Sequence, residues 1–145
     1  MRISMKSDYG IRAVLDLAQR FGEGPVQSGD IAGRQGIPEP YLEQLLTTLR
    51  KAGLIRSVRG PQGGHSLIKT PQEISVAEVI MALEGSIAPI DCIHEVKTCK
   101  RSQICVQRDI WKEIDEITQK YLDATTIASL LERQSAREAQ SMYYI

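Results

Sequence analysis

The chain has 145 residues, 42% of them hydrophobic and 25% charged, which suits one globular domain and leaves no room for separate cofactor and substrate domains. Eighteen Lys and Arg balance eighteen Asp and Glu, no uncharged apolar run approaches the roughly 20 residues of a membrane helix, and residues 1–8 lack a secretion signal. We therefore expect a cytoplasmic protein with no membrane partner.

Three helices are predicted in the first third of the chain. Apolar residues recur at helical spacing over 7–21, and Ser28 is placed to cap a short second helix that stops at Gly36. Two prolines then suit a helix start, and a stripe of four leucines marks a third helix over 41–53. The second and third helices have the length and spacing of a helix-turn-helix.

A β-hairpin follows these helices. Residues 54–58 and 65–68 alternate as two short strands, and the glycine-rich segment 59–64 between them suits a tight turn. We therefore expect residues 1–70 to form a winged helix-turn-helix DNA-binding region.

The second half of the chain predicts further helices. A capping box at 75–78 opens a helix that ends near Glu84, a long helix covers about 103–123, and a short one follows around Ile127. From Gln134 no pattern remains, so we expect 134–145 to be a flexible tail. The predicted fold is mainly α with a small hairpin, a winged helix-turn-helix followed by a long dimerisation helix.

The charge distribution favours a nucleic-acid surface on the first region. Residues 1–70 carry ten Lys and Arg against six Asp and Glu, residues 71–145 carry eight against twelve, and no acidic residue lies between Glu43 and Glu73. Such a stretch is typical of a polyanion site, although a solvated face is the alternative. The candidate DNA-binding residues are Tyr41, Glu43, Gln44, Thr47, Arg50, Lys51, Arg56, Arg59, Gln62 and Gly63.

Individual roles follow from side-chain chemistry. Gln44 has the paired donor and acceptor that adenine requires, and Glu43 can accept a hydrogen bond from the amine of cytosine. Arg59 lies on a slim hairpin whose glycines let the backbone approach a phosphate or a minor groove.

The three cysteines, Cys92, Cys99 and Cys105, lie in one polar loop, separated by six and then five residues. Neighbouring Lys and Arg favour thiolates, and three soft ligands on a flexible loop suit an iron-sulfur cluster or zinc. The spacing matches neither zinc knuckles nor common ferredoxins, so thiol redox switching and inert cysteines stay open. Familiar catalytic motifs are absent from the sequence, and we do not expect an enzyme.

The long helix predicts a homodimer, because its apolar face is larger than a small monomer readily covers. An intramolecular core position is the alternative for its lone tryptophan. The candidate dimerisation residues are Ile110, Trp111, Ile114, Ile117 and Tyr121.

These motifs resemble the Rrf2 family of bacterial winged-helix regulators, most closely its iron-sulfur cluster regulator (IscR) branch. The resemblance covers nearly the whole chain. It rests on residues 9–18, 41–45, 49–54 and 57–64 and on the cysteine loop up to Trp111. It implies a homodimer with crossed long helices, a cluster on each cysteine loop near the dimer contact, and wings on promoter DNA. It also implies that the state of the cluster alters which promoters are bound.

The sequence departs from that branch at the fourth cluster ligand. Arg108 stands three residues after the last cysteine, where the branch usually has histidine, and a guanidinium stays protonated and cannot ligate. The nitric-oxide-sensing branch of the family implies another ligand, an aspartate of the partner subunit at the start of the first helix, which is Asp8 here. His94 and Glu95 are local candidates, and helix capping is the alternative role of Asp8.

Two smaller departures concern spacing and base preference. The first cysteine gap is one residue longer than in many relatives, and Pro38 and Pro40 stand where relatives often carry serine. The base preference of relatives therefore cannot be copied to this chain.

The expected function is that of a transcription regulator that senses iron-sulfur cluster status and controls cluster biogenesis or stress-response genes. Residues 71–133 then hold the cluster loop and the dimerisation helices, and the protein joins the bacterial nucleoid when it binds promoter DNA. The cluster has two or four irons, and a purified preparation can lack it. The alternatives are a nitric oxide or thiol-redox sensor of the same family and a metal-binding interaction module without specific DNA binding.

Overall fold

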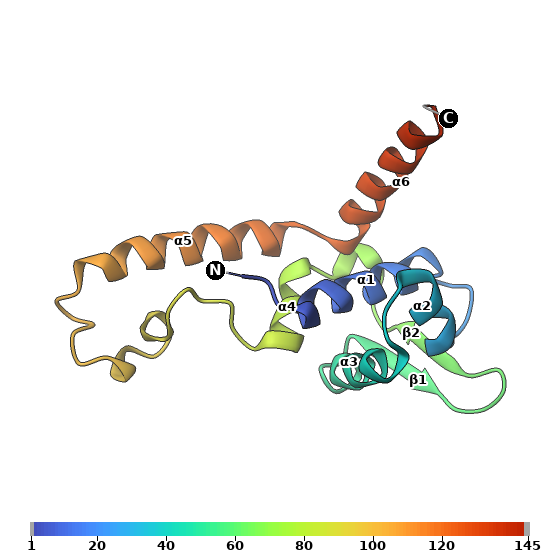
Figure 1. Ribbon diagram of the computed structural model, residues 1–145, viewed down its shortest axis with the longest axis horizontal. Coiled ribbons are helices and arrows are strands. Elements are labelled where there is room, and N and C mark those ends of the chain that lie inside the picture. The colour runs from blue at the N-terminus through green and yellow to red at the C-terminus, as the bar shows by residue number, and fades with distance from the viewer. Residues whose placement is uncertain (1, 144–145) are drawn as a thin grey trace.

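In the computed structural model, which describes residues 2–143, a head of helices and a hairpin carries a projecting arm and a projecting last helix (Figure 1). The elements are α1 (Met5–Gln19), α2 (Ser28–Gln35), α3 (Glu39–Lys51), β1 (Ile55–Val58), β2 (Gly64–Leu67), η1 (Pro71–Glu73), α4 (Val76–Glu84), η2 (Asp91–Ile93), η3 (Val96–Thr98), α5 (Val106–Ala124) and α6 (Ile127–Tyr143). The predicted class, mainly α with a small antiparallel hairpin, is confirmed.

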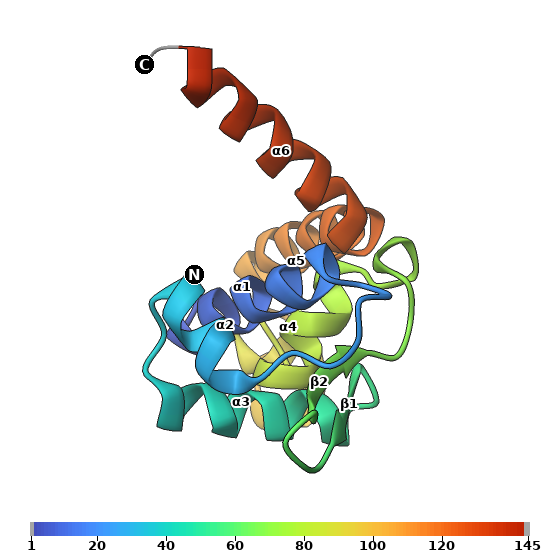
Figure 2. The same cartoon turned by 90° about the vertical axis from the view of Figure 1, so that its right-hand side faces the viewer.

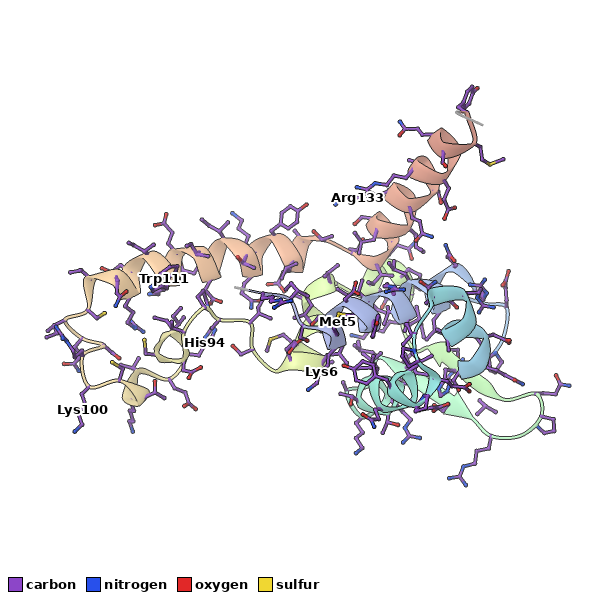
Figure 3. All side chains as sticks on the ribbon, viewed as in Figure 1. Met5, Lys6, His94, Lys100, Trp111 and Arg133 are labelled. Carbon is purple, nitrogen blue, oxygen red and sulfur yellow. The ribbon has the colours of Figure 1, made fainter. Side chains whose placement is uncertain are left out.

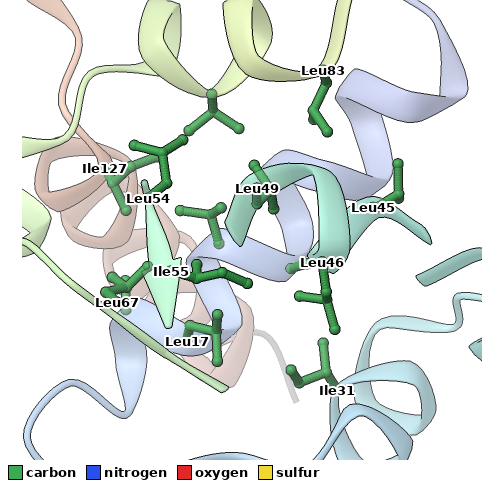
Figure 4. Close-up of a cluster of buried hydrophobic side chains, with 14 of the residues drawn as sticks. Leu17, Ile31, Leu45, Leu46, Leu49, Leu54, Ile55, Leu67, Leu83 and Ile127 are labelled. Carbon is green, nitrogen blue, oxygen red and sulfur yellow. The ribbon is translucent and has the colours of Figure 1, made fainter. Parts of the chain in front are cut away.

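The leucine stripe of α3 forms the centre of the head. Leu42, Leu45, Leu46 and Leu49 are all buried, as their helical spacing predicts, and they pack against apolar residues of α1, α2 and β1 (Figure 4). Each such leucine contributes about 1.5 to 3 kcal/mol by leaving water. This burial leaves the polar residues of α3 on the outside of the head.

The hairpin is held to the head along one edge. Its strands pair with Ile55 opposite Leu67, and Val26, which precedes α2, forms a further bridge to His65. Val26 and His65 exchange two backbone hydrogen bonds of 2.7 and 2.8 Å. Gly64 makes this approach possible, since a Cβ there would lie 2.4 Å from the Val26 carbonyl oxygen.

The core of the head continues beyond residue 70. The predicted capping box is confirmed, because the backbone amide of Glu78 donates to the Ser75 hydroxyl while the Glu78 carboxylate accepts from the Ser75 amide. α4 then packs along α1, and Ile127 at the start of α6 is fully buried in the same core. The division of the chain at residue 70 stays a prediction.

The arm consists of the segment 86–105 and α5, and it extends away from the head (Figure 1). Asp115 is the one buried residue among the described residues of α5. The turned view shows α6 rising on its own from the head (Figure 2). Across residues 2–143, no helix is long and apolar enough to cross a membrane.

Two local predictions are wrong. Ser28 is the first residue of α2 rather than its cap, and its hydroxyl donates to Glu43 of α3 instead. Residues 134–143, for which we expected no regular structure, continue α6. They lack an apolar stripe but are rich in good helix formers, and Gln134 bonds to Glu138 one turn later at 2.9 Å. Residues 144–145 of the predicted tail lie outside the described residues.

A buried carboxylate joins α1 to α2. Asp16 is 1% exposed and accepts two hydrogen bonds from the Arg34 guanidinium, at 3.0 and 2.9 Å, and one from Gln35 at 3.1 Å. Burial alone would raise the pKa of Asp16, but these hydrogen bonds and the charges of Arg20 and Arg34 hold it below its ordinary value. The last turn of α2 is thereby fixed on α1.

Asp16→Asn should lower the free energy of unfolding by about 2 kcal/mol at pH 7, because the amide keeps the shape but loses the charge-assisted hydrogen bonds. The midpoint of urea unfolding measures the loss. The control is Asp8→Asn, which breaks an exposed 3.4 Å contact to Arg12 on the same helix and should cost less than about 1 kcal/mol.

The same pair gives a pH test. Since the pKa of Asp16 is lowered on folding, its stabilisation is full above the unfolded-state pKa and disappears as pH falls through the folded-state pKa. Wild type and Asp16→Asn should therefore converge in stability at acid pH. A stability gap that stays constant down to the acid unfolding of wild type would contradict the role of this carboxylate.

Candidate DNA-binding surface and cysteine loop

The exposed face of α3 and the turn of the hairpin lie along one edge of the head in both views (Figures 1 and 2). Glu43, Gln44, Arg50 and Lys51 of α3 are exposed, and Thr47 is half-buried. Arg56, Arg59 and Gln62 of the hairpin are exposed as well. The structure thus brings most of the predicted DNA-binding residues onto one side of the head.

Several polar groups on α3 are already engaged. The hydroxyl of Thr47 donates to the Glu43 carbonyl at 2.8 Å, and that of Thr48 to the Gln44 carbonyl at 3.1 Å. The Glu43 carboxylate accepts from Ser28. The Gln44 side chain has no such partner within residues 2–143, so its amide is available to a ligand.

Tyr41 has a different environment from the other predicted contacts. It is half-buried, and its ring packs edge-on against Tyr9 of α1, with the ring centroids 5.8 Å apart. The Arg12 guanidinium lies 5.2 Å from the centre of the Tyr9 ring. Tyr41 therefore fixes the start of α3 against α1, and contact of its ring with DNA stays a prediction.

The turn of the hairpin, residues 59–63, is tight. Gly63 is buried, its amide donates to the Gly60 carbonyl at 2.9 Å, and a Cβ on it would lie 2.1 Å from the Val58 carbonyl oxygen. Gly63 therefore shapes the turn, while Arg59 extends from it without an ion pair in the described chain. Gln27 supports the turn by donating to the Pro61 carbonyl at 3.3 Å.

His65 shows how close the hairpin lies to α3. Its ring Nδ1 is 2.8 Å from the Ser57 hydroxyl across the strand pair. Burial lowers the pKa of His65. The positive charge of Arg50 lowers this pKa further, and the negative charge of Glu43 raises it in part. The ring is therefore neutral near pH 7 and serves the structure of the hairpin.

The three cysteines lie at different points of the arm. Cys92 is half-buried in η2, Cys99 is exposed at the end of η3, and Cys105 is half-buried just before α5. No group of three or more His, Cys, Asp or Glu side chains between residues 2 and 143 is gathered to hold a metal ion. The donor set has the right chemistry for a cluster, three free thiols in one loop, but the loop as folded does not bring them together.

The three candidates for the fourth ligand, Asp8, His94 and Glu95, are not gathered with the cysteines either. Asp8 is exposed in the first turn of α1 and contacts Arg12 at 3.4 Å. Glu95 is exposed in the loop, and His94 Nε2 lies 3.3 Å from the Asp115 carboxylate. Asp8 does not join the cysteines within one chain, so ligation by this residue requires the partner's chain.

Hydrogen bonds organise the cysteine loop. The buried hydroxyl of Ser102 lies 3.0 Å from the Val96 carbonyl oxygen and 2.8 Å from that of Cys99. Arg108 donates from Nε to the Cys92 carbonyl at 3.0 Å and from Nη2 to the Ile93 carbonyl at 3.3 Å. These partners could not be predicted from the sequence, because hydrogen bonds from side chains to backbone carbonyls leave no periodic pattern.

The predicted dimerisation residues of α5 differ in their exposure. Ile110, Ile117 and Tyr121 are 58%, 62% and 60% exposed and form an outward stripe. Trp111 and Ile114 are half-buried, and Trp111 lies on the side of α5 toward His94 and the loop (Figure 3). The outward stripe has no partner in the described chain.

Comparisons with known proteins agree on one family. A family model named Rrf2 and described as an iron-dependent transcriptional regulator matches residues 3–133. The chain is 41% identical over 131 residues to Protein rrf2 of Nitratidesulfovibrio vulgaris, which covers 90% of this chain and 87% of that protein.

Two solved structures share the fold at substantial identity. CymR (YrzC), the global cysteine regulator of B. subtilis, has a TM-score of 0.77 and 34% identity over 92% of this chain and 98% of that one. T. potens IscR has a TM-score of 0.76 and 43% identity over 99% of this chain and 97% of that one.

Proposed function

The chain belongs to the Rrf2 family of transcriptional regulators, and on that premise we propose that it binds promoter DNA as a homodimer and senses iron-sulfur cluster status through its cysteine loop. Its matched relatives are named as regulators, so the chain is a transcriptional regulator and not an enzyme. The observation that carries the proposal is the shared edge of α3 and the hairpin turn, where an unengaged amide and unpaired cations of the described chain lie together.

α3 is the element that enters the major groove in this proposal. Its leucine face is fixed in the core, so Gln44 and Lys51 point away from the head, and Gln44 is free to pair with a base edge. The hairpin turn follows the adjacent backbone, where Arg59 contacts a phosphate. Glu43, which accepts from Ser28, then limits which bases fit beside α2.

The outward stripe of α5 supports a homodimer. An exposed apolar stripe on a long helix is covered when a second copy of the same helix packs against it. A two-fold dimer presents two α3 helices and two hairpins, which suits a palindromic operator.

The three thiols would hold the cluster, with Asp8 of the partner subunit as the fourth ligand. When bound, an iron-sulfur cluster supplies a redox-sensitive and oxygen-sensitive group with one hard, exchangeable carboxylate ligand. The residues of the chain contribute the soft donors, on a loop that also carries Lys97, Lys100 and Arg101. The cysteine loop must rearrange to gather the three sulfurs.

A cluster-free thiol sensor is the second candidate. The specific observation in its favour is that Ser102 and Arg108 organise the loop through hydrogen bonds, with Cys99 exposed. The likeness to CymR, a cysteine regulator, adds support.

DNA binding should weaken steeply with salt, with a slope of about −0.9 per phosphate neutralised. Arg59→Ala should reduce affinity for all sequences and make the slope shallower by about one. Gln44→Ala should instead lose about 1 to 3 kcal/mol of discrimination between sites. Anisotropy titrations on operators from a randomised-site selection measure both effects, with Lys112→Ala on α5 as the control that leaves them unchanged. A Gln44→Ala protein with wild-type site preference would remove base recognition from this residue.

Ile117→Glu should convert the dimer to monomer, because two buried glutamates would face each other across the outward stripe. Sedimentation at micromolar concentration measures the change, and circular dichroism checks that the protein stays folded. Lys112→Glu adds the same residue on a polar side of α5 and should leave the dimer intact. A folded wild-type monomer under these conditions would overturn the assembly.

Anaerobic purification should give a brown protein with bound iron and sulfide. Cys92→Ser, Cys99→Ser and Cys105→Ser should each lose the cluster, and Asp8→Ala should change its spectrum or lability while the dimer persists. Asp30→Ala, an exposed acidic position on α2, is the control. A wild-type protein that binds zinc alone or no metal would shift the function to the thiol sensor, and an Asp8→Ala cluster indistinguishable from wild type would leave His94 as the next ligand candidate.

A further inference from the structure

Arg108 makes contacts that differ from those of an ordinary surface arginine. Its side chain is half-buried, forms no salt bridge within residues 2–143, and donates two hydrogen bonds to the carbonyls of Cys92 and Ile93. A charged donor directed at two successive carbonyls holds a short piece of backbone in one orientation. The guanidinium therefore fixes the segment that bears the first cysteine.

A second side chain of α5 holds the next residue of that segment. Asp115 is 5% exposed, and its Oδ2 lies 3.3 Å from Nε2 of His94. Its Oδ1 has no hydrogen-bond partner in the described part of the chain. Asp115 follows Arg108 by seven residues, two helical turns, so the two side chains point to the same side of α5. Trp111 lies between them on that side (Figure 3).

We propose that Arg108 and Asp115 form a clamp, the α5 clamp, that docks residues 92–94 on the inner side of α5 in the metal-free protein. Arg108 is thus a positioning residue, which acts on Cys92 through the backbone of the loop. The clamp keeps Cys92 half-buried, as Cys105 also is, and leaves Cys99 as the exposed thiol. The proposal deepens the sensing role and rests on it, since the clamp matters to regulation only if these cysteines are the sensor.

The clamp has a mechanical consequence for sensing. Any event that requires Cys92 to move toward the other two cysteines has to break the two Arg108 hydrogen bonds first. Arg108 lies in the first turn of α5, the helix that carries the outward stripe. Breaking its two hydrogen bonds therefore changes the contacts of that helix. Asp115 also lines a cavity of about 480 Å³ together with Ser4 and Glu84 of the head, so its release alters the junction of arm and head.

The test compares alkylation rates of the three thiols within one molecule. Metal-free reduced protein is pulsed with isotope-coded N-ethylmaleimide, and mass spectrometry gives the rate at each cysteine. In wild type, Cys92 should react more slowly than Cys99. Arg108→Gln should raise the Cys92 rate by about tenfold, the scale of a lost charge-assisted hydrogen bond, and leave the Cys99 rate within about twofold.

Further variants separate positioning from a general loss of structure. Asp115→Asn should raise the Cys92 rate by a smaller factor, and Arg108→Lys, which keeps one charged donor, should restore part of the protection. Arg101→Gln removes an exposed arginine of the same loop and should change no rate. Circular dichroism and the dimer mass verify that each variant is folded.

Three outcomes would overturn the clamp. The first is a folded Arg108→Gln protein whose Cys92 rate equals that of wild type, and the second is a wild-type Cys92 that reacts as fast as Cys99. A rise at all three cysteines together would also contradict it, because that pattern means unfolding of the loop. The alkylation assay needs neither DNA nor a cluster. It can therefore be interpreted even if the protein does not sense clusters, and a negative result for the clamp does not affect the test of cluster binding.

Discussion

The ion pair between buried Asp16 and exposed Arg34 is the constraint on which the presentation of α3 depends. α2 contributes little to the core, with Ile31 and Ala32 as its buried residues, so apolar packing alone would leave its axis free to slide on α1. The two hydrogen bonds from Arg34 fix that axis at the end of α2, next to the turn that leads into α3. The Asp16 carboxylate of α1 therefore helps to position the proposed DNA-binding face, together with the buried leucines of α3.

α5 gives the molecule a second organising surface. Its outward side is apolar and suits a partner helix, while its inner side carries Arg108 and Asp115, which hold the cysteine loop. One helix thus touches the proposed sensor segment on one side and the proposed dimer contact on the other. A change in the loop and a change in the dimer are then two effects on a single rigid element.

The sequence predicts the head well because its elements depend on local rules. The four leucines of α3, the Ser75 capping box and the glycine-rich turn are specified by period, hydrogen-bonding type and backbone conformation, and the structure has them all. Two of the misses involve side chains with distant partners. Ser28 suits a helix cap by residue type, but Glu43, fifteen residues on, takes its hydroxyl. From the sequence, Arg108 is a residue that cannot ligate a metal. Its hydrogen bond to the Cys92 carbonyl can be recognised only in the structure, where the loop lies beside α5.

The bridge between Val26 and His65 gives the hairpin a property that isolated hairpins lack. With Val26 on one edge and Gln27 hydrogen-bonded to the turn, the strands and the tip have one conformation before any ligand arrives. A flexible loop would lose conformational entropy on reaching a phosphate backbone, and part of its contact energy would be offset by that loss. A preorganised hairpin avoids most of that loss, so more of the energy of each polar contact at its tip remains available for binding.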